Sequence, residues 1–98
     1  MTINPTLMCI AWYRLQDWNE LTIMLPDLKP FSGTYQEWLQ RAEKSLRENE
    51  GNGRTVIRVV IYPERFRRWC RYQGLDIDAE AHKEFVNEEC LRIYRETN

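Results

Sequence analysis

The chain has 98 residues, and its 14 Lys and Arg residues against 15 Asp and Glu residues leave a formal net charge of -1. A chain of this length buries little more than about 60% of its unfolded surface, which excludes an enzyme built from separate cofactor and substrate domains. With 43% hydrophobic and 30% charged residues, the composition is that of a globular protein and excludes a disordered one. We therefore expect a single domain over residues 1–98.

The first part of the chain predicts a strand and then a short helix. Residues 7–14 are apolar and aromatic, which is typical of a strand. Residues 17–25 predict a helix in which Asp17 is the N-cap and Glu20 completes a capping box. Two β-branched residues in this segment leave a strand at residues 21–25 as an alternative.

The strongest helix signal follows a loop that contains two prolines. Thr34 and Glu37 have the spacing of a capping box, and the predicted helix over residues 34–50 ends at a Gly-Asn-Gly turn. Its apolar residues recur at helical spacing and form one stripe that we expect to face the core: Tyr35, Trp38, Leu39, Ala42 and Leu46.

The second half of the chain predicts one more strand and two more helices. Residues 55–62 are rich in β-branched residues and apolar on both faces except at Arg58, as in a strand covered from both sides. A proline opens the helix predicted over residues 63–74 and a glycine ends it, and Asp78 is the predicted N-cap of a last helix that runs to about residue 94. The sequence thus predicts an α+β fold of order βααβαα, with a two-stranded sheet covered by four helices. A homodimer would extend this marginal sheet to four strands.

The cysteines and the first residues of the chain indicate a cytoplasmic protein. Cys9, Cys70 and Cys90 are widely spaced, odd in number and without a CxxC pair, which favours reduced, buried thiols over a disulfide framework or a zinc site. The first twelve residues lack the basic start of a signal peptide, and no apolar run is long enough to span a membrane.

The near-zero net charge conceals a segregation of charge along the chain. Residues 54–74 hold six basic residues and one acidic residue, net +5, between segments of net -2 and -4. In the helix over residues 63–74, one exposed arc collects the candidate anion- or partner-binding residues: Arg65, Arg67, Arg68, Arg71 and Tyr72. Arg68 and Tyr72 have the spacing of a cation–π pair, and such a surface suits phosphates and bases. The alternative is that the acidic last helix neutralises these arginines, as the balanced net charge favours.

Three polar residues fall on surfaces that we otherwise expect to be apolar. His82 and Glu89 lie on the core-facing arc of the last helix, and Arg58 is the charge within the second strand. We expect Arg58 and Glu89 to form a buried ion pair, because an unpaired buried carboxylate is costly. A Cys–His nucleophile formed by His82 with Cys70 or Cys90 is the least favoured alternative. The residue types and spacings predict no metal site and no cofactor.

Several segments resemble short bacterial proteins of uncharacterised function. The resemblance rests on TYQEWLQRAE, on VIRVVI, on the F-x-x-WC-x-x-x-G pattern that starts at Phe66, and on Asp78 before the last helix, and it implies a bacterial cytoplasmic protein without implying an activity. From the residues we expect a small non-catalytic protein-interaction or regulatory module that forms a homodimer or binds an unidentified protein, away from membranes. The alternative is a nucleic-acid-binding regulator that uses the arginine-rich helix over residues 63–74.

Overall fold

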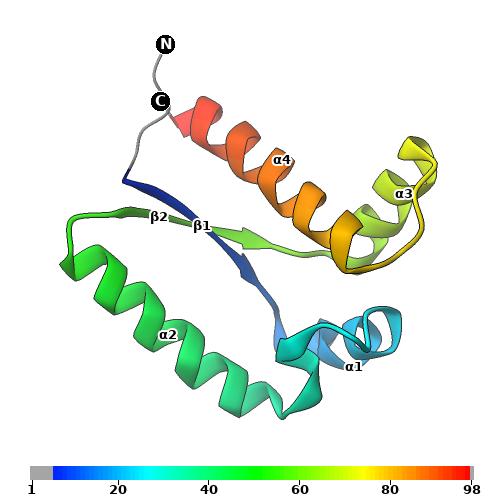
Figure 1. Cartoon of the computed structure of the whole chain (residues 1–98), viewed down its shortest axis with the longest axis horizontal. Coiled ribbons are helices and arrows are strands. Elements are labelled where there is room, and N and C mark those ends of the chain that lie inside the picture. Colours follow the sequence, from blue (N-terminus) through cyan, green and yellow to red (C-terminus); the bar gives the residue numbers. More distant parts are fainter. Residues whose placement is uncertain (1–5, 98) are drawn as a thin grey trace.

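Two parallel strands lie between two layers of helices (Figure 1). The computed structural model describes residues 6–97. Strand β1 spans Leu7–Trp12 and strand β2 spans Thr55–Val60, paired in parallel from Leu7 opposite Thr55 to Trp12 opposite Val60. The connection between them holds α1 (Leu15–Met24), a 3-10 turn (Lys29–Ser32) and α2 (Tyr35–Gly51), and a crossover of this length permits a parallel pair. Helices α3 (Pro63–Gln73) and α4 (Ala79–Thr97) follow β2.

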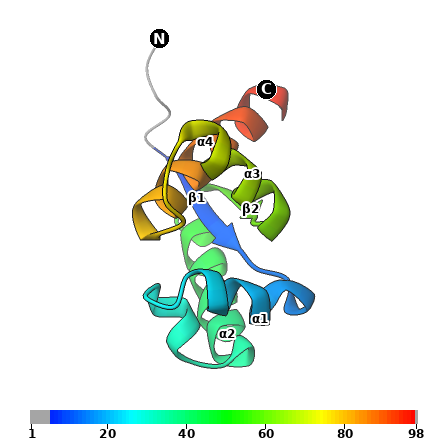
Figure 2. The same ribbon diagram turned by 90° about the vertical axis from the view of Figure 1, so that its right-hand side faces the viewer.

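The predicted order βααβαα, the four helices and the pairing of the two strands are confirmed. Helices α1 and α2 lie on one side of the strands and α3 and α4 on the other in both views (Figures 1 and 2). The strand alternative at residues 21–25 is wrong, because α1 continues to Met24.

Most of the predicted helix boundaries follow from local chemistry. The Thr34–Glu37 capping box forms with both of its hydrogen bonds, Glu37 N to Thr34 Oγ1 (3.1 Å) and Thr34 N to Glu37 Oε1 (2.9 Å). Gly74 ends α3 with a φ of 69°, a left-handed conformation that glycine adopts without strain. Asp78 caps α4 by accepting a hydrogen bond from the main-chain N–H of Ala81 at 2.9 Å.

The capping box predicted at the start of α1 is wrong. The helix begins at Leu15 with Arg14 as its N-cap residue, so Asp17 lies inside the first turn. There the Asp17 carboxylate accepts a hydrogen bond from Arg14 Nε at 2.7 Å and is only 8% exposed. A carboxylate in the first turn also favours the helix electrostatically, so an ion pair replaces the side-chain cap.

Aromatic side chains from four elements make up the centre of the core. The ring centroid of Tyr13, the residue directly after β1, lies 4.9 Å from the centroids of both Phe31 and Trp38. The ring centroids of Phe66 in α3 and Phe85 in α4 are 5.3 Å apart. Because the ring centroid of Tyr13 also lies 6.0 Å from that of His82 in α4, Tyr13 contacts both helical layers just after β1 ends.

Candidate functional site

The arginine-rich face of α3 is partly neutralised by acidic residues. Arg65 Nη2 lies 2.8 Å from Glu89 Oε1 of α4, and Arg67 pairs with Glu20 of α1 and with Glu64 at 3.7 Å. The expected neutralisation by the last helix is therefore confirmed only for Arg65, because Arg67 finds its partner on α1. Within residues 6–97, neither Arg68 nor Arg71 makes an ion pair.

The unneutralised part of this face consists of Arg68, Arg71 and Tyr72. All three side chains are exposed, and Tyr72, at 89%, is the most exposed large apolar or aromatic residue within residues 6–97. They stand at positions i, i+3 and i+4 of α3 and so share one stripe. The cation–π pair expected between Arg68 and Tyr72 is not among the contacts of the described residues, where the cation–π pairs are Arg14 with Tyr62 and Arg58 with Trp12.

The predicted buried pair of Arg58 and Glu89 does not form. Glu89 lies between Arg65 and Arg92, whose Nε is 2.9 Å away, while the exposed Arg58 places its guanidinium 5.2 Å from the centre of the Trp12 ring. The alternation of side chains along β2 explains the error. Arg58 projects from the face of the sheet that α2 covers, whereas α4 packs on the opposite face.

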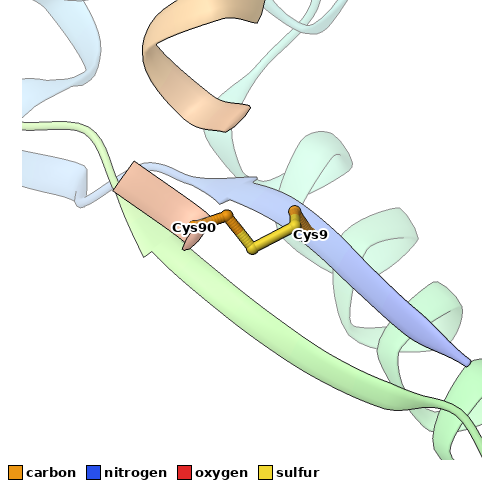
Figure 3. Close-up of a disulfide and its surroundings, with 2 residues drawn as sticks. All are labelled: Cys9 and Cys90. Atoms are coloured by element: carbon orange, nitrogen blue, oxygen red, sulfur yellow. A yellow bond between two sulfur atoms is a disulfide. The ribbon is translucent and has the colours of Figure 1, made fainter. Parts of the chain in front are cut away.

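The expectation that all three cysteines are reduced is wrong. A disulfide joins Cys9 of β1 to Cys90 of α4, with the two Cα atoms 6.0 Å apart (Figure 3). Cys90 is fully buried, and Cys70 remains a free, buried thiol. Nothing in the local spacing points to this bond, since the two residues are 81 positions apart and meet only when α4 packs across the sheet.

His82 is a core residue, as its place on the apolar arc of α4 indicates. Its Nε2 lies 3.0 Å from the hydroxyl of Tyr13, and both side chains are buried. Burial lowers the pKa of His82 to about 4 and raises the pKa of Tyr13 well above its usual value, so both groups are neutral near pH 7.

The arrangement of the cysteines does not favour a Cys–His nucleophile. Burial raises the pKa of the Cys70 thiol, which is opposite to the shift that activates a nucleophilic cysteine. The sulfur of Cys90 is held in the disulfide.

Ligand-binding features are sparse over residues 6–97. An open depression of about 390 Å³ lies between the turn after α1 and the start of α4, and its lining includes Met24, Leu28 and Ile77. No group of three or more potential metal ligands occurs in this part of the chain, and none of its helices combines the length and apolarity needed to cross a membrane.

Each strand of the two-stranded sheet has one outer hydrogen-bonding edge, and that of β1 is formed by its odd-numbered residues. Thr55 N donates to Thr6 O and Ile61 N to Trp12 O, both at 2.9 Å, so the even-numbered residues of β1 direct their main-chain groups to β2. Leu7, Cys9 and Ala11 therefore direct their N–H and C=O groups away from β2. No described residue pairs with them there, since the sheet has two strands only.

The outer edges of β1 and β2 differ in their protection against further pairing. Edge strands of soluble proteins are commonly guarded by charged residues or proline, and β2 has Arg58 at the centre of its edge. Strand β1, with the sequence LMCIAW, has no charged residue and no proline, and all six of its side chains are half-buried. Its edge is thus the one better suited to accept another strand.

Comparison with known proteins adds no relative to this description: no family model, no curated protein and no solved structure matches the chain.

Proposed function

We propose that this chain is a small non-catalytic protein-interaction module that binds an extended protein segment along the outer edge of β1. The observation that carries this proposal is the set of main-chain groups of Leu7, Cys9 and Ala11, which point away from β2 along a strand without a guarding charge. An added strand would form main-chain hydrogen bonds with these groups, as in other proteins that bind peptides by extending a sheet.

Two proline substitutions test this proposal as a matched pair. The N–H groups of Ala11 in β1 and Val60 in β2 both point away from the partner strand, so either position can become proline without the loss of a hydrogen bond inside the sheet. Ala11→Pro blocks the outer edge of β1 and Val60→Pro that of β2. A circular dichroism melt of each variant first establishes that it is folded.

The measurement is the selection of linear peptides from a displayed random library by the immobilised protein. We expect peptides that bind the unmodified chain and Val60→Pro but lose about tenfold or more in affinity for Ala11→Pro, as expected for lost main-chain hydrogen bonds. Peptides that bind both variants equally, or the absence of any selected peptide at a concentration where the chain is monomeric, would contradict the proposal.

A nucleic-acid-binding regulator is the second candidate, and it rests on Arg68, Arg71 and Tyr72. Two arginines without carboxylate partners beside an exposed aromatic ring suit phosphate contacts and base stacking. We rank it below the first candidate because Arg65 and Arg67 are already paired and the chain has net charge -1.

A mobility-shift assay at low and high salt separates the two candidates. Binding of single-stranded DNA or RNA that weakens steeply with salt and is lost in Arg68→Ala/Arg71→Ala would favour the second candidate. The matched control is Arg41→Ala/Arg47→Ala, which removes two exposed arginines from α2 instead. No shift at low salt would reject nucleic-acid binding.

The compartment in which the module acts remains a prediction, and the disulfide argues against the cytoplasm. Disulfides persist mainly in oxidising compartments and are rare in cytosolic proteins. Cysteine alkylation in denaturant directly after cell lysis, with and without prior reduction, tests the point. Protection of Cys9 and Cys90 before reduction places the protein in an oxidising environment, whereas immediate labelling supports the cytoplasmic prediction.

A further inference from the structure

The two outer edges of the sheet differ in whether they can pair with themselves. In an antiparallel pairing of two β2 strands centred on Arg58, the two Arg58 side chains would stand directly opposite each other, and like charges in that position are destabilising. The same pairing of two β1 strands brings no charges together. Self-association of the sheet is therefore favoured at β1.

A two-fold axis through Cys9 uses every outward main-chain group of β1. Cys9 then lies opposite Cys9 of the second copy, and Leu7 lies opposite Ala11 of the second copy. These are the positions at which the main-chain groups point outward, so each opposed pair exchanges its two hydrogen bonds.

The same register would also bury apolar side chains of β1 that are only partly buried within one chain. Met8 and Ile10 project from the face of the sheet that α2 covers, and both are only partly buried there. In the pairing about Cys9, Met8 of each copy stands opposite Ile10 of the other, at the closely spaced positions of an antiparallel pair. Four apolar side chains, each only partly buried within its own chain, would meet around the two-fold axis.

The shape of the chain provides enough surface for this contact. Its principal extents are 35 × 32 × 19 Å, and Figures 1 and 2 together show that the short axis runs across the two strands. The outer edge of β1 therefore lies on a broad face of about 35 by 32 Å. A standard-size interface covers about 800 Å² on each partner, which is less than the area of this face.

We propose that the segment bound at the edge of β1 is β1 of a second copy of this chain, paired antiparallel about Cys9 into a four-stranded sheet of order β2-β1-β1-β2. The proposal rests on the proposed function, for which it names the partner. In a two-fold interface the same surface of each copy meets, so β1 needs to be complementary only to itself.

Two double substitutions test the partner and the register together. Met8→Lys/Ile10→Lys places lysine opposite lysine across the proposed axis, whereas Met8→Glu/Ile10→Lys places glutamate opposite lysine with the same number of new charges. Light scattering coupled to size separation, over a range of protein concentrations, gives the mass of each variant, and a circular dichroism melt at low concentration shows whether it is folded.

We expect the mass of two chains for the unmodified protein and for Met8→Glu/Ile10→Lys, and the mass of one chain for Met8→Lys/Ile10→Lys. An unmodified protein that stays at the mass of one chain at millimolar concentration would overturn the proposal. So would a dimer that survives in folded Met8→Lys/Ile10→Lys, because the interface would then lie elsewhere.

Amide hydrogen exchange distinguishes failure of this proposal from failure of the proposed function. We expect the amides of Leu7, Cys9 and Ala11 to become protected as the protein concentration rises. Fast exchange of these amides at every concentration would overturn the second copy as partner but leave an open edge for another protein. Protection at concentrations where the chain is monomeric would show an edge already covered within the chain, which would overturn both proposals.

Discussion

The two faces of the sheet are each covered by helices, yet only one of them is closed. On the α4 face, Val59 and Ile61 are at most 1% exposed, and the Cys9–Cys90 disulfide ties the strand to the helix. On the α2 face, no strand residue is buried: Val60 is half-buried and Arg58 is exposed. The most deeply buried strand-side residues therefore lie on the α4 face, while the α2 face and the neighbouring edge of β1 leave apolar surface for a partner.

Removal of the disulfide should reduce the stability of the protein the most, because the bond ties β1 to α4 on the closed face. Reduction, or Cys90→Ala, releases a loop that spans 81 positions and should lower the free energy of unfolding by about 4.5 kcal/mol on the chain-entropy estimate. Urea unfolding with and without reductant measures the loss. Reductant should change the stability of Cys70→Ala by the same amount, since Cys70 lies outside the bond; no effect of reductant on the unmodified chain would mean that the α4 face does not depend on the disulfide.

Acid should have the second-largest effect on stability, through His82 in α4. Burial lowers the pKa of His82 to about 4 from an unfolded value near 6.5, so between these pH values the unfolded chain binds more protons than the folded chain. The contribution of His82 to stability is complete above pH 6.5 and falls as the pH drops toward 4, by about 3 kcal/mol in all.

Urea midpoints at pH 7, 5.5 and 4 measure the acid effect. His82→Gln, which keeps a polar side chain without a titrating ring, should show a smaller loss between pH 7 and 5.5 than the unmodified chain. Equal losses in the two proteins would show that His82 is not the group responsible.

Two neighbouring valines compare the two faces directly. Val59→Ala removes two methyl groups from a side chain that is 1% exposed on the α4 face and should cost about 2 kcal/mol. Val60→Ala makes the same change on the α2 face, where the side chain is half-exposed, and should cost less than about 1 kcal/mol in the monomer. Chemical denaturation at low protein concentration checks both values; equal costs would contradict the difference between the faces.

The smallest expected effect belongs to the start of α2. Thr34→Ala removes the acceptor for Glu37 N and should cost about 1 kcal/mol, whereas Thr34→Ser keeps the hydroxyl and should cost much less. Thermal melts of the two variants make the comparison, and equal melting temperatures would show that the capping box does not stabilise α2.

Local sequence signals predicted the fold but not the cross-chain contacts that shape the candidate sites. The capping box at Thr34, the left-handed Gly74 and the β-branched run of β2 depend on residues close together in the chain, and all three appear as expected. The start of α1 was misplaced because Asp17 serves as the carboxylate of an ion pair with Arg14 rather than as a cap.

The partners of the charged residues and of the cysteines depend on how the layers assemble. The stripe of arginines on α3 follows from helical spacing, but the pairing of Arg67 with Glu20 requires α1 to lie beside α3. Similarly, strand alternation alone places Arg58 and Val59 on opposite faces, while the helix that covers each face is decided by the crossover. In the sequence, the open edge of β1 was visible only as a predicted strand that has no charge before Arg14.

The disulfide has a further consequence for how the chain responds to proteases. Because Cys9 and Cys90 lie near the two ends of the printed sequence, the bond closes most of the chain into a covalent ring. A single cut in any loop of that ring, such as the turn at Gly53 or the segment after Gly74, produces two fragments that the sulfur bridge still holds together. The nicked protein would have the mass of the intact chain plus one water until a reductant separates the pieces.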